Sequence, residues 1–508
     1  MTVPSAEVGG SVAVESASER LRFAALVSAV FAILLVPCLL THELWRDEAW
    51  QWLVVSESHS FAELFDGLSR GGAGSLVPIL DFLALLLSTS PRAMQAVQLL
   101  IATAGAFAFV RWAPLRRWER ATFVFGYFPF YEYGVISRPY GMGVLLLWLA
   151  CAASRGRRPA LGFAAAIGLL CQTTFHGYIL AIALVCGWLL DRWWRRAELA
   201  PLTRSDVAVG LLLAIAGAIA GIVQFVPAPE TKAPPLFLGW AAARLQTVAA
   251  IPWRAFVPLP RFDLHFWNTN VLEAWPVQQA LAGVLALAVA FLLLRSSRVA
   301  LATFAIGAAG LLAFCYVSHP GQIRYQGHLW LLLLGAAWLG GGAGFDRGWR
   351  RLVVAALLVA HVAAAAFATS MDLRHPFSNG RATAAFLRSQ GLDRYPLLGH
   401  REPPAATISL YLGRPLYSPS RRVFMTHWDW SPLQRELTDS ELRCAARELA
   451  QTRGDVVIVE NRELPSWEEL EPAGSVVGAI VPTEDYHLYW LRRGRLAATA
   501  PQTPCPPP

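Results

Sequence analysis

Repeated apolar runs bounded by arginine constrain this chain more than any other feature of its sequence. The first run extends from Arg22 to Leu40, and runs of the same kind recur as far as Thr369. A run of about 20 predominantly apolar residues is long enough to cross a bilayer as a helix. Hydrophobic residues make up 55% of the 508 residues and charged residues only 15%, a balance that soluble proteins of this size rarely have. The sequence therefore predicts a mainly α-helical, polytopic membrane protein.

The arginines between these runs predict the orientation of the chain. Cytoplasmic loops are enriched in Lys and Arg, so Arg20 and Arg22 place the N-terminus in the cytoplasm. No small-residue cleavage site follows the first run, so we expect an uncleaved anchor. About eleven spans then place the C-terminus outside. Their expected limits are 22–40, 94–112, 122–133, 140–153, 160–173, 179–193, 207–225, 277–294, 299–317, 329–342 and 352–369. The net charge of +8 thus reflects topology and not nucleic-acid binding.

The segment from Leu76 to Ser88 is apolar but short, and two interpretations of it stay open. If it crossed the membrane, the cluster of arginines from Arg111 to Arg120 would fall outside. We therefore expect an outer-surface or re-entrant helix, with a true crossing as the alternative.

The composition divides the chain into four parts. Residues 1–21 are expected to be a disordered cytoplasmic N-terminus, and residues 22–370 a transmembrane domain with outer loops at 41–93 and 226–276. In residues 371–497 short β-like runs alternate with helix-like ones, which predicts a small α/β domain outside the membrane. The tail 498–508 is expected to be disordered. Expected strands are 395–399, 456–459, 476–481 and 487–491, and expected helices are 380–390 and 439–451, the latter starting at Thr438.

Cysteine usage adds one weak expectation. The seven cysteines show no metal-ligand spacing, and five lie in or beside apolar runs as small core residues. Cys444 and Cys505 could pair in an oxidising compartment.

Three carboxylates follow the first span within a tryptophan-rich stretch, THELWRDEAWQW. They are Glu43, Asp47 and Glu48. Tryptophan is enriched where a membrane meets water, so these acids are expected just outside the lipid, where a general base could act on a lipid-borne substrate. A solvated loop with interfacial tryptophans is the alternative explanation.

Further polar side chains are expected in three other turns on the same side. Ionisable groups at membrane depth are costly and usually mark function. The turns contribute Glu132, Arg138, Tyr140, His176, Arg324, Tyr325 and His328, and the stretch 226–275, a candidate lid or binding loop, contributes Lys232. Each also has an ordinary explanation, for example an arginine that marks topology.

Acids opposite arginines suit one reaction class. A carboxylate can deprotonate an acceptor hydroxyl while arginines stabilise a leaving phosphate, which they bind with two parallel hydrogen bonds. An amphiphilic cavity at the lipid surface suits a sugar phosphate on a polyprenyl chain.

Four motifs resemble the GT-C superfamily of polytopic glycosyltransferases, such as protein O-mannosyltransferases and lipid A aminoarabinose transferases. They are LWRDEAWQW, RWAPLRRWERA, FPFYEYGVISRPYGM (placed at the outer surface) and IRYQGHLWLLLL, and they cover roughly residues 22–369. The resemblance implies that Asp47 is the catalytic base, with Glu48 its acidic neighbour. It implies that Arg138, Tyr140, Arg324 and Tyr325 bind the donor phosphate or shape its pocket. The family's His-Pro-Pro-like stretch is replaced here by GGAGSLVPIL.

The resemblance implies an inverting transferase that uses a polyprenyl-phosphate sugar, in the plasma (inner) membrane, with a glycolipid, polysaccharide or protein acceptor. Two alternatives stay open: a transporter or flippase of lipid-linked sugars, and a diphosphate-donor polysaccharide polymerase or ligase. No cofactor is implied. A divalent cation at Asp47 and Glu48 is possible, but their spacing is not diagnostic.

Overall fold

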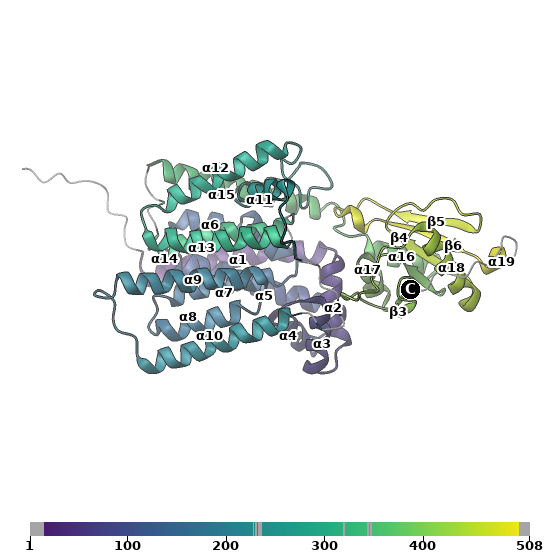
Figure 1. The fold of residues 1–508 in the computed structure, drawn as a ribbon, viewed down its shortest axis with the longest axis horizontal. Helices are drawn as coiled ribbons and strands as arrows, with labels where there is room; N and C mark the ends of the chain where they lie inside the picture. Colours follow the sequence, from purple (N-terminus) through teal and green to yellow (C-terminus); the bar gives the residue numbers. More distant parts are fainter. Residues whose placement is uncertain are drawn as a thin grey trace, which may run out of the picture.

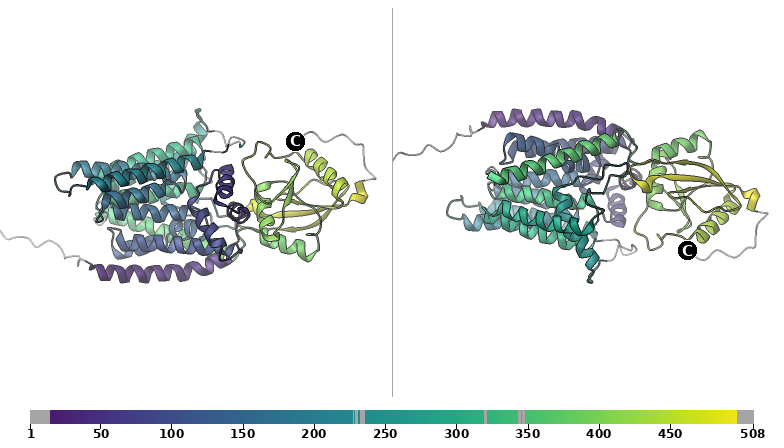
Figure 2. Two further views of the ribbon diagram at one scale, coloured as in Figure 1. Left: turned by 90° about the horizontal axis from the view of Figure 1, so that it is seen from below. Right: turned by 90° about the horizontal axis from the view of Figure 1, so that it is seen from above.

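The structure, a computed structural model, consists of a helical bundle with a smaller α/β domain at one end (Figure 1). It describes residues 15–226, 228, 231, 236–318, 321–342, 345 and 348–496. Figure 2 shows from two further sides that the small domain caps one end of the bundle, and that α1 runs along the rim. The predicted fold class is confirmed: a mainly α-helical membrane domain followed by a small mixed domain.

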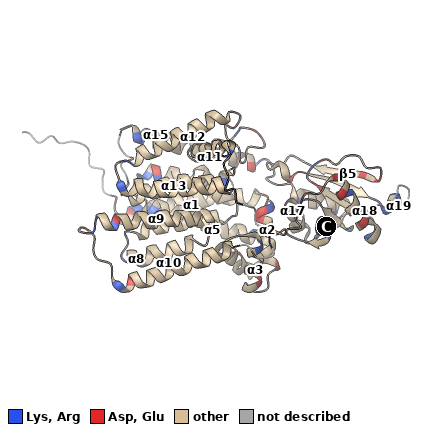
Figure 3. Cartoon of the chain, in the orientation of Figure 1, with Lys and Arg blue, Asp and Glu red and all other residues tan. Residues whose placement is uncertain are grey.

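Seven helices in the described part of the chain are long and apolar enough to cross a membrane. They are α1 (Ala17–Thr41), α5 (Arg92–Trp112), α9 (Phe175–Trp194), α10 (Arg204–Phe225), α12 (Pro276–Leu294), α13 (Arg298–Val317) and α15 (Gly348–Asp372). Three shorter helices also lie in the bundle: α7 (Tyr140–Ala153), α8 (Pro159–Leu170) and α14 (Ile323–Leu339). Figure 3 shows that Lys, Arg, Asp and Glu gather at the ends of these helices and leave their middles uncharged. The count of eleven spans stays a prediction.

The first helix begins earlier than the sequence suggested. Helix α1 starts at Ala17, within the segment expected to be disordered. The Ser16 side chain accepts from the Glu19 amide, and the Glu19 carboxylate accepts from the Ser16 amide. This reciprocal capping stabilises a helix start, and it explains the earlier beginning. The expected disorder of residues 1–14 and of the tail lies outside the described residues.

The third predicted span is not one helix. It is split into α6 (Arg117–Val124) and a π-helix, η1 (Tyr127–Val135). The break falls at Gly126, where a Cβ atom would approach the Phe123 carbonyl oxygen to 3.0 Å. Every residue of η1 is buried, so FPFYEYGV packs inside the protein, and its place at the outer membrane surface stays a prediction. π-helices are rare and often occur at functional sites.

The predicted outer loops contain helices. Residues 41–93 form α2 (Arg46–Glu57), α3 (Phe61–Gly71) and α4 (Leu76–Leu85) before α5 begins. The 10 residues of α4 span only about 15 Å, half the thickness of a bilayer core, which supports a helix that does not cross. The loop expected at 226–276 contains α11 (Ala242–Phe256), which packs against α12 and α14 and so belongs to the bundle.

The C-terminal domain contains a six-stranded sheet in the order β3-β2-β1-β4-β6-β5. Strands β1 (Leu397–Gly399), β2 (Leu416–Ser418) and β4 (Val456–Glu460) are parallel, whereas β3 (Val423–Met425), β5 (Leu470–Val476) and β6 (Tyr486–Leu491) pair antiparallel. The helices are α16 (Gly380–Ser389), α17 (Glu402–Leu412), α18 (Asp439–Arg453) and α19 (Arg493–Leu496), with a 3₁₀ turn, η2 (Pro482–Glu484).

Most elements of this domain agree with the sequence analysis. Helix α18 starts at Thr438, whose side chain accepts from the Glu441 amide, as predicted. The strand expected at 476–481 is wrong: β5 ends at Val476, and Gly478 has a φ of +101°, which takes the chain out of extended structure. Cys444 is disulfide-bonded. Cys505 lies outside the described residues, and the other five cysteines are free thiols.

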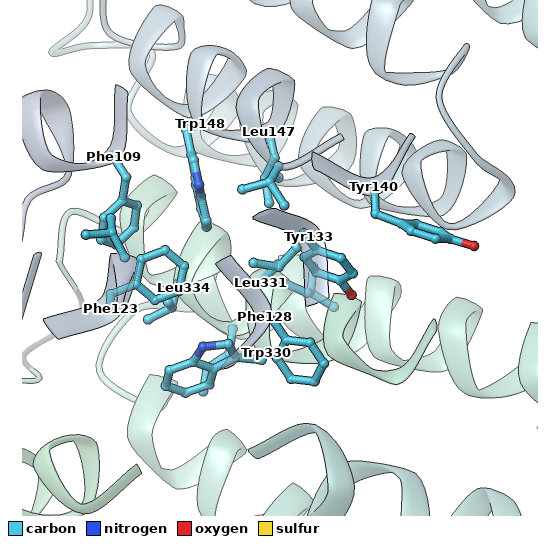
Figure 4. Packing of buried hydrophobic residues seen from close by; sticks show 14 of the residues in the cluster. Phe109, Phe123, Phe128, Tyr133, Tyr140, Leu147, Trp148, Trp330, Leu331 and Leu334 are labelled. Carbon is cyan, nitrogen blue, oxygen red and sulfur yellow. The ribbon is translucent and has the colours of Figure 1, made fainter. Parts of the chain in front are cut away.

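Aromatic side chains fill the core of the bundle where η1 meets α14. Figure 4 shows Phe109, Phe123, Trp148 and Trp330 packed together, with Tyr133 and Phe128 beside them. The Phe109 and Phe123 rings lie 4.1 Å apart between centroids. Large rings bury much apolar area and pack in fixed geometries, so this core holds η1 and α14 rigidly against each other.

Candidate active site

Asp47 lies in the first turn of α2, at the end of the bundle that faces the C-terminal domain. The helix starts here because Glu48 accepts a hydrogen bond from the Trp45 amide at 3.2 Å, the return bond of a capping box. Acidic residues in a first turn also interact favourably with the positive end of the helix dipole. The sequence RDEA therefore favours a helix start and places Asp47 in the first turn of α2.

Two arginines from distant parts of the chain meet the Asp47 carboxylate. Nη2 of Arg324, in the first turn of α14, lies 3.3 Å from Oδ2, and Nη2 of Arg138, just before α7, lies 3.7 Å from the same oxygen. Nη1 of Arg138 also donates to the Asp47 carbonyl oxygen at 2.8 Å. The predicted convergence of these three side chains is therefore confirmed as geometry, while their roles stay predictions.

The two guanidinium groups have hydrogen-bond donors to spare. The Arg324 side chain is only 9% exposed and that of Arg138 17% exposed. Yet Nε and Nη1 of Arg324 and Nε of Arg138 are buried without a hydrogen-bond partner among the described residues. Buried polar groups are nearly always paired, and an exception calls for an explanation. These donors are suited to a planar or tetrahedral oxyanion.

Aromatic rings surround the Arg324 guanidinium. Its Cζ atom lies 5.1 Å from the centroid of Trp45, 5.1 Å from that of Tyr325 and 5.7 Å from that of Trp267. Such contacts stabilise a cation away from water. Sequence analysis missed Trp267, whose indole Nε1 donates to Glu132 at 3.1 Å. A tryptophan inside a long loop carries no signal that would single it out.

The electrostatics keep Asp47 ionised. Burial acts against the charged form, but Arg138, Arg324 and Arg46 outweigh it and hold the pKa of Asp47 below its usual value. A carboxylate of low pKa accepts a proton only from a group that has become acidic, such as a hydroxyl that is forming a bond to carbon.

Glu48 is fully buried and points away from this cluster. Its Oε1 accepts from the Ser137 amide at 2.6 Å, and its Oε2 lies 3.1 Å from Nε2 of His42. Nδ1 of His42 in turn lies 2.8 Å from Asp372. Burial lowers the pKa of His42, but Asp372 and Glu48 raise it to about 10, so the imidazole is charged. Glu48 thus ties the turn that carries Arg138 to the start of α2, and its catalytic role stays a prediction.

A cation shared by Asp47 and Glu48 would have to displace the present partners of Glu48. The Glu48 oxygens are occupied as described, and the described residues contain no group of three or more His, Cys, Asp or Glu side chains able to hold a metal ion.

The remaining predicted residues fall into three places. Tyr325 stacks on His176 at 4.8 Å, His176 stacks on His328 at 4.7 Å, and Tyr140 packs edge-on against Tyr325, so these form one wall of the site. Glu132 is not in a turn but buried in η1, where it supports Trp267. Glu43 faces the C-terminal domain, 3.9 Å from Arg381. Lys232 lies outside the described residues.

No protein-family model matches the sequence, and no curated protein matches it significantly. Among solved structures the chain is similar to ArnT from Cupriavidus metallidurans in the apo state, with a TM-score of 0.52 and 14% identity over 93% of this chain and 99% of that chain. The likeness to this structure shows that the chain has an ArnT-like fold. ArnT from the same organism bound to undecaprenyl phosphate gives a TM-score of 0.48 and 12% identity over 94% of this chain and 98% of that chain.

An ArnT-like fold and seven long apolar helices among the described residues support an integral membrane protein. At these identities the likeness establishes the fold alone, and the chemistry of the site has to be argued from the residues of this chain.

Proposed function

We propose that this chain is a membrane glycosyltransferase that moves a sugar from a polyprenyl phosphate to an acceptor hydroxyl. The observation that carries the proposal is the set of buried, unpartnered guanidinium donors on Arg138 and Arg324 beside the Asp47 carboxylate. A phosphate oxyanion would satisfy these donors, and the neighbouring carboxylate would face the hydroxyl that attacks.

The reaction balances with these groups alone. As the acceptor oxygen bonds to the anomeric carbon of the sugar, its proton passes to Asp47. The bond from that carbon to the phosphate oxygen breaks, and the electron pair stays on the phosphate, which Arg138 and Arg324 stabilise. Attack from the side opposite the phosphate gives inversion, as when a carboxylate activates a nucleophile in glycoside hydrolysis.

The expected location is the outer face of the plasma (inner) membrane, with the C-terminal domain outside. The disulfide at Cys444 supports this location, because disulfides persist in oxidising compartments. Figure 3 shows basic residues at the bundle end away from this domain, which fits the cytoplasmic side.

The decisive experiment uses the purified full-length chain in proteoliposomes, with a polyprenyl-phosphate sugar and candidate acceptors. We expect transfer with wild-type protein, none with Asp47→Asn, and retained donor binding in that variant. Full turnover by Asp47→Asn would remove Asp47 from the base role. Transfer from diphosphate-linked lipids alone would favour a polymerase or ligase. Movement of the lipid-linked sugar between leaflets without transfer would favour a transporter.

A further inference from the structure

A buried acid of the C-terminal domain contacts the start of α2. Glu484, in the turn η2, is fully buried. Its Oε1 accepts a hydrogen bond from the backbone amide of Arg46 at 3.2 Å, across 438 residues of sequence. Arg46 is the first residue of α2 and directly precedes Asp47.

Glu484 is itself held in place by its own domain. Its Oε2 accepts from the Ser378 hydroxyl at 2.8 Å and from the Tyr486 hydroxyl at 3.2 Å. Its carbonyl oxygen accepts from the Asn379 amide at 3.2 Å. The carboxylate is thus held by two hydroxyl donors and its backbone by a third hydrogen bond, so the Arg46 amide is held at a fixed place relative to the sheet.

This contact provides a hydrogen-bond acceptor for the Arg46 amide, which has none within α2. The first amides of a helix have no acceptor within the helix, and a carboxylate placed there also interacts with the helix dipole. Glu48, within α2, accepts a hydrogen bond from the Trp45 amide. Glu484, in the C-terminal domain, accepts one from the Arg46 amide. The start of the helix that carries Asp47 is therefore fixed by one acid from each domain.

We propose that Glu484 is a positioning residue, through which the C-terminal domain sets Asp47 against Arg138 and Arg324. The effect on turnover rests on the proposed function, but the effect on α2 does not. A shift of about 1 Å at a reacting group can lower a rate about 100-fold. The domain thus acts as part of the site although none of its side chains contacts Asp47 in the described structure.

The protonation of Glu484 should make this role visible in the pH dependence of turnover. Burial raises the pKa of Glu484 to about 7, although Arg46 and the hydrogen bonds from Ser378 and Tyr486 act against it. The groups that face it are Arg46 from α2, Tyr486 from β6 and the uncharged Ser378; its neighbour Asp485 bonds to Asn379. As pH falls through 7 the carboxylate gains a proton and loses one acceptor position, so we expect turnover to fall there.

Glu484→Ala and Glu484→Gln test the proposal in the full-length protein. Turnover at saturating donor, donor affinity and amide hydrogen exchange at residues 46–48 are measured. For Glu484→Ala we expect turnover to fall about 10- to 100-fold, donor affinity to stay within about twofold, and exchange at α2 to rise. For Glu484→Gln, which like the protonated acid keeps one acceptor oxygen, we expect turnover close to that of wild type below pH 7 and no decline near pH 7.

The matched control is Glu469→Ala, which removes an equally buried acid of the same domain whose carboxylate binds Arg443 and Arg447. It should lower stability without changing turnover or exchange at α2. A folded Glu484→Ala protein with wild-type turnover and exchange would overturn the proposal, as would a parallel loss of donor affinity. If wild-type protein shows no transfer but exchange at α2 still rises in Glu484→Ala, the proposed function fails and the positioning contact stands.

Discussion

Two of the acids in the described structure, Glu469 and Asp47, each lie between two arginines, and these two clusters differ in how completely they are bonded. In the C-terminal domain, Glu469 accepts from Arg443 at 2.6 and 2.7 Å and from Arg447 at 2.6 Å, with both oxygens engaged. At the end of the bundle, the shortest side-chain contacts of Asp47 are 3.3 and 3.7 Å.

The difference shows in which cluster the charged groups are fully hydrogen-bonded without a ligand. Hydrogen bonds to Arg443 and Arg447 outweigh burial and lower the pKa of Glu469 to about 2, and neither arginine has a buried donor without a partner. Arg324 and Arg138 do have such donors. Both clusters contain the same residue types, so composition cannot distinguish a structural ion cluster from a binding site. Buried arginine donors that lack a hydrogen-bond partner can distinguish them.

The largest effect is expected from removing the Asp47 charge. Asp47→Asn keeps the shape of the side chain but cannot take a proton, so transfer should fall by about 10²- to 10⁴-fold. Glu469→Gln is the corresponding change in the complete cluster and should leave the rate unchanged. Initial rates in proteoliposomes measure both, and equal losses would show that the two clusters do not differ in the way proposed.

Arg324→Lys should have the next largest effect. Lysine keeps the charge but lacks the planar pair of donors, and a hydrogen bond to a charged group contributes about 1.5–3 kcal/mol. Donor lipid should therefore bind about 10- to 100-fold more weakly, as measured by a binding titration with a polyprenyl phosphate. Arg443→Lys should leave the affinity as it is; a similar loss there would argue against a specific phosphate site.

Removing Glu469 from its cluster with Arg443 and Arg447 should lower stability and leave activity unchanged. Glu469→Ala leaves two arginines that are 34% and 26% exposed, so water replaces part of the lost interaction and the cost should be about 1–2 kcal/mol. Because the pKa of Glu469 is lowered when folded, its stabilisation is present above the usual carboxyl value and is lost as pH falls toward 2. Thermal unfolding as a function of pH should show this loss in wild type and not in the variant.

The smallest expected effect is a shift in pH dependence. Arg138 helps to lower the pKa of Asp47, so Arg138→Gln should raise that pKa and move the acidic decline of turnover to higher pH. The comparison is made in the Glu484→Gln background, which lacks the decline near pH 7. No movement would mean that Asp47 is not the group that titrates.

The sequence predicted well what depends on long apolar runs and local patterns. Helices α1, α5, α10 and α12 lie where the hydropathy placed them, and the capping residues of α18 were read directly. Arg138 and Arg324 were expected near Asp47 because turns on one side of a membrane protein can meet.

Contacts across the fold could not be read in this way. Glu132 looked like a turn residue because an aromatic run with proline resembles an interfacial loop, whereas packing turns it into a buried π-helix. Glu48 looked like a second catalytic acid, but its role depends on His42 and the Ser137 amide, which only the fold brings near. The bond from Arg46 to Glu484 joins residues too distant for any local pattern.

The indole rings against Arg324 have a practical consequence. Indole emission responds to nearby charge, so an anion that neutralises this guanidinium should change the fluorescence of Trp45 and Trp267, whose centroids lie 5.1 and 5.7 Å away. The chain has 20 tryptophans, but a difference spectrum against Trp267→Phe would isolate the signal. Tryptophan fluorescence would therefore test the proposed binding of a lipid phosphate without a label or a known acceptor.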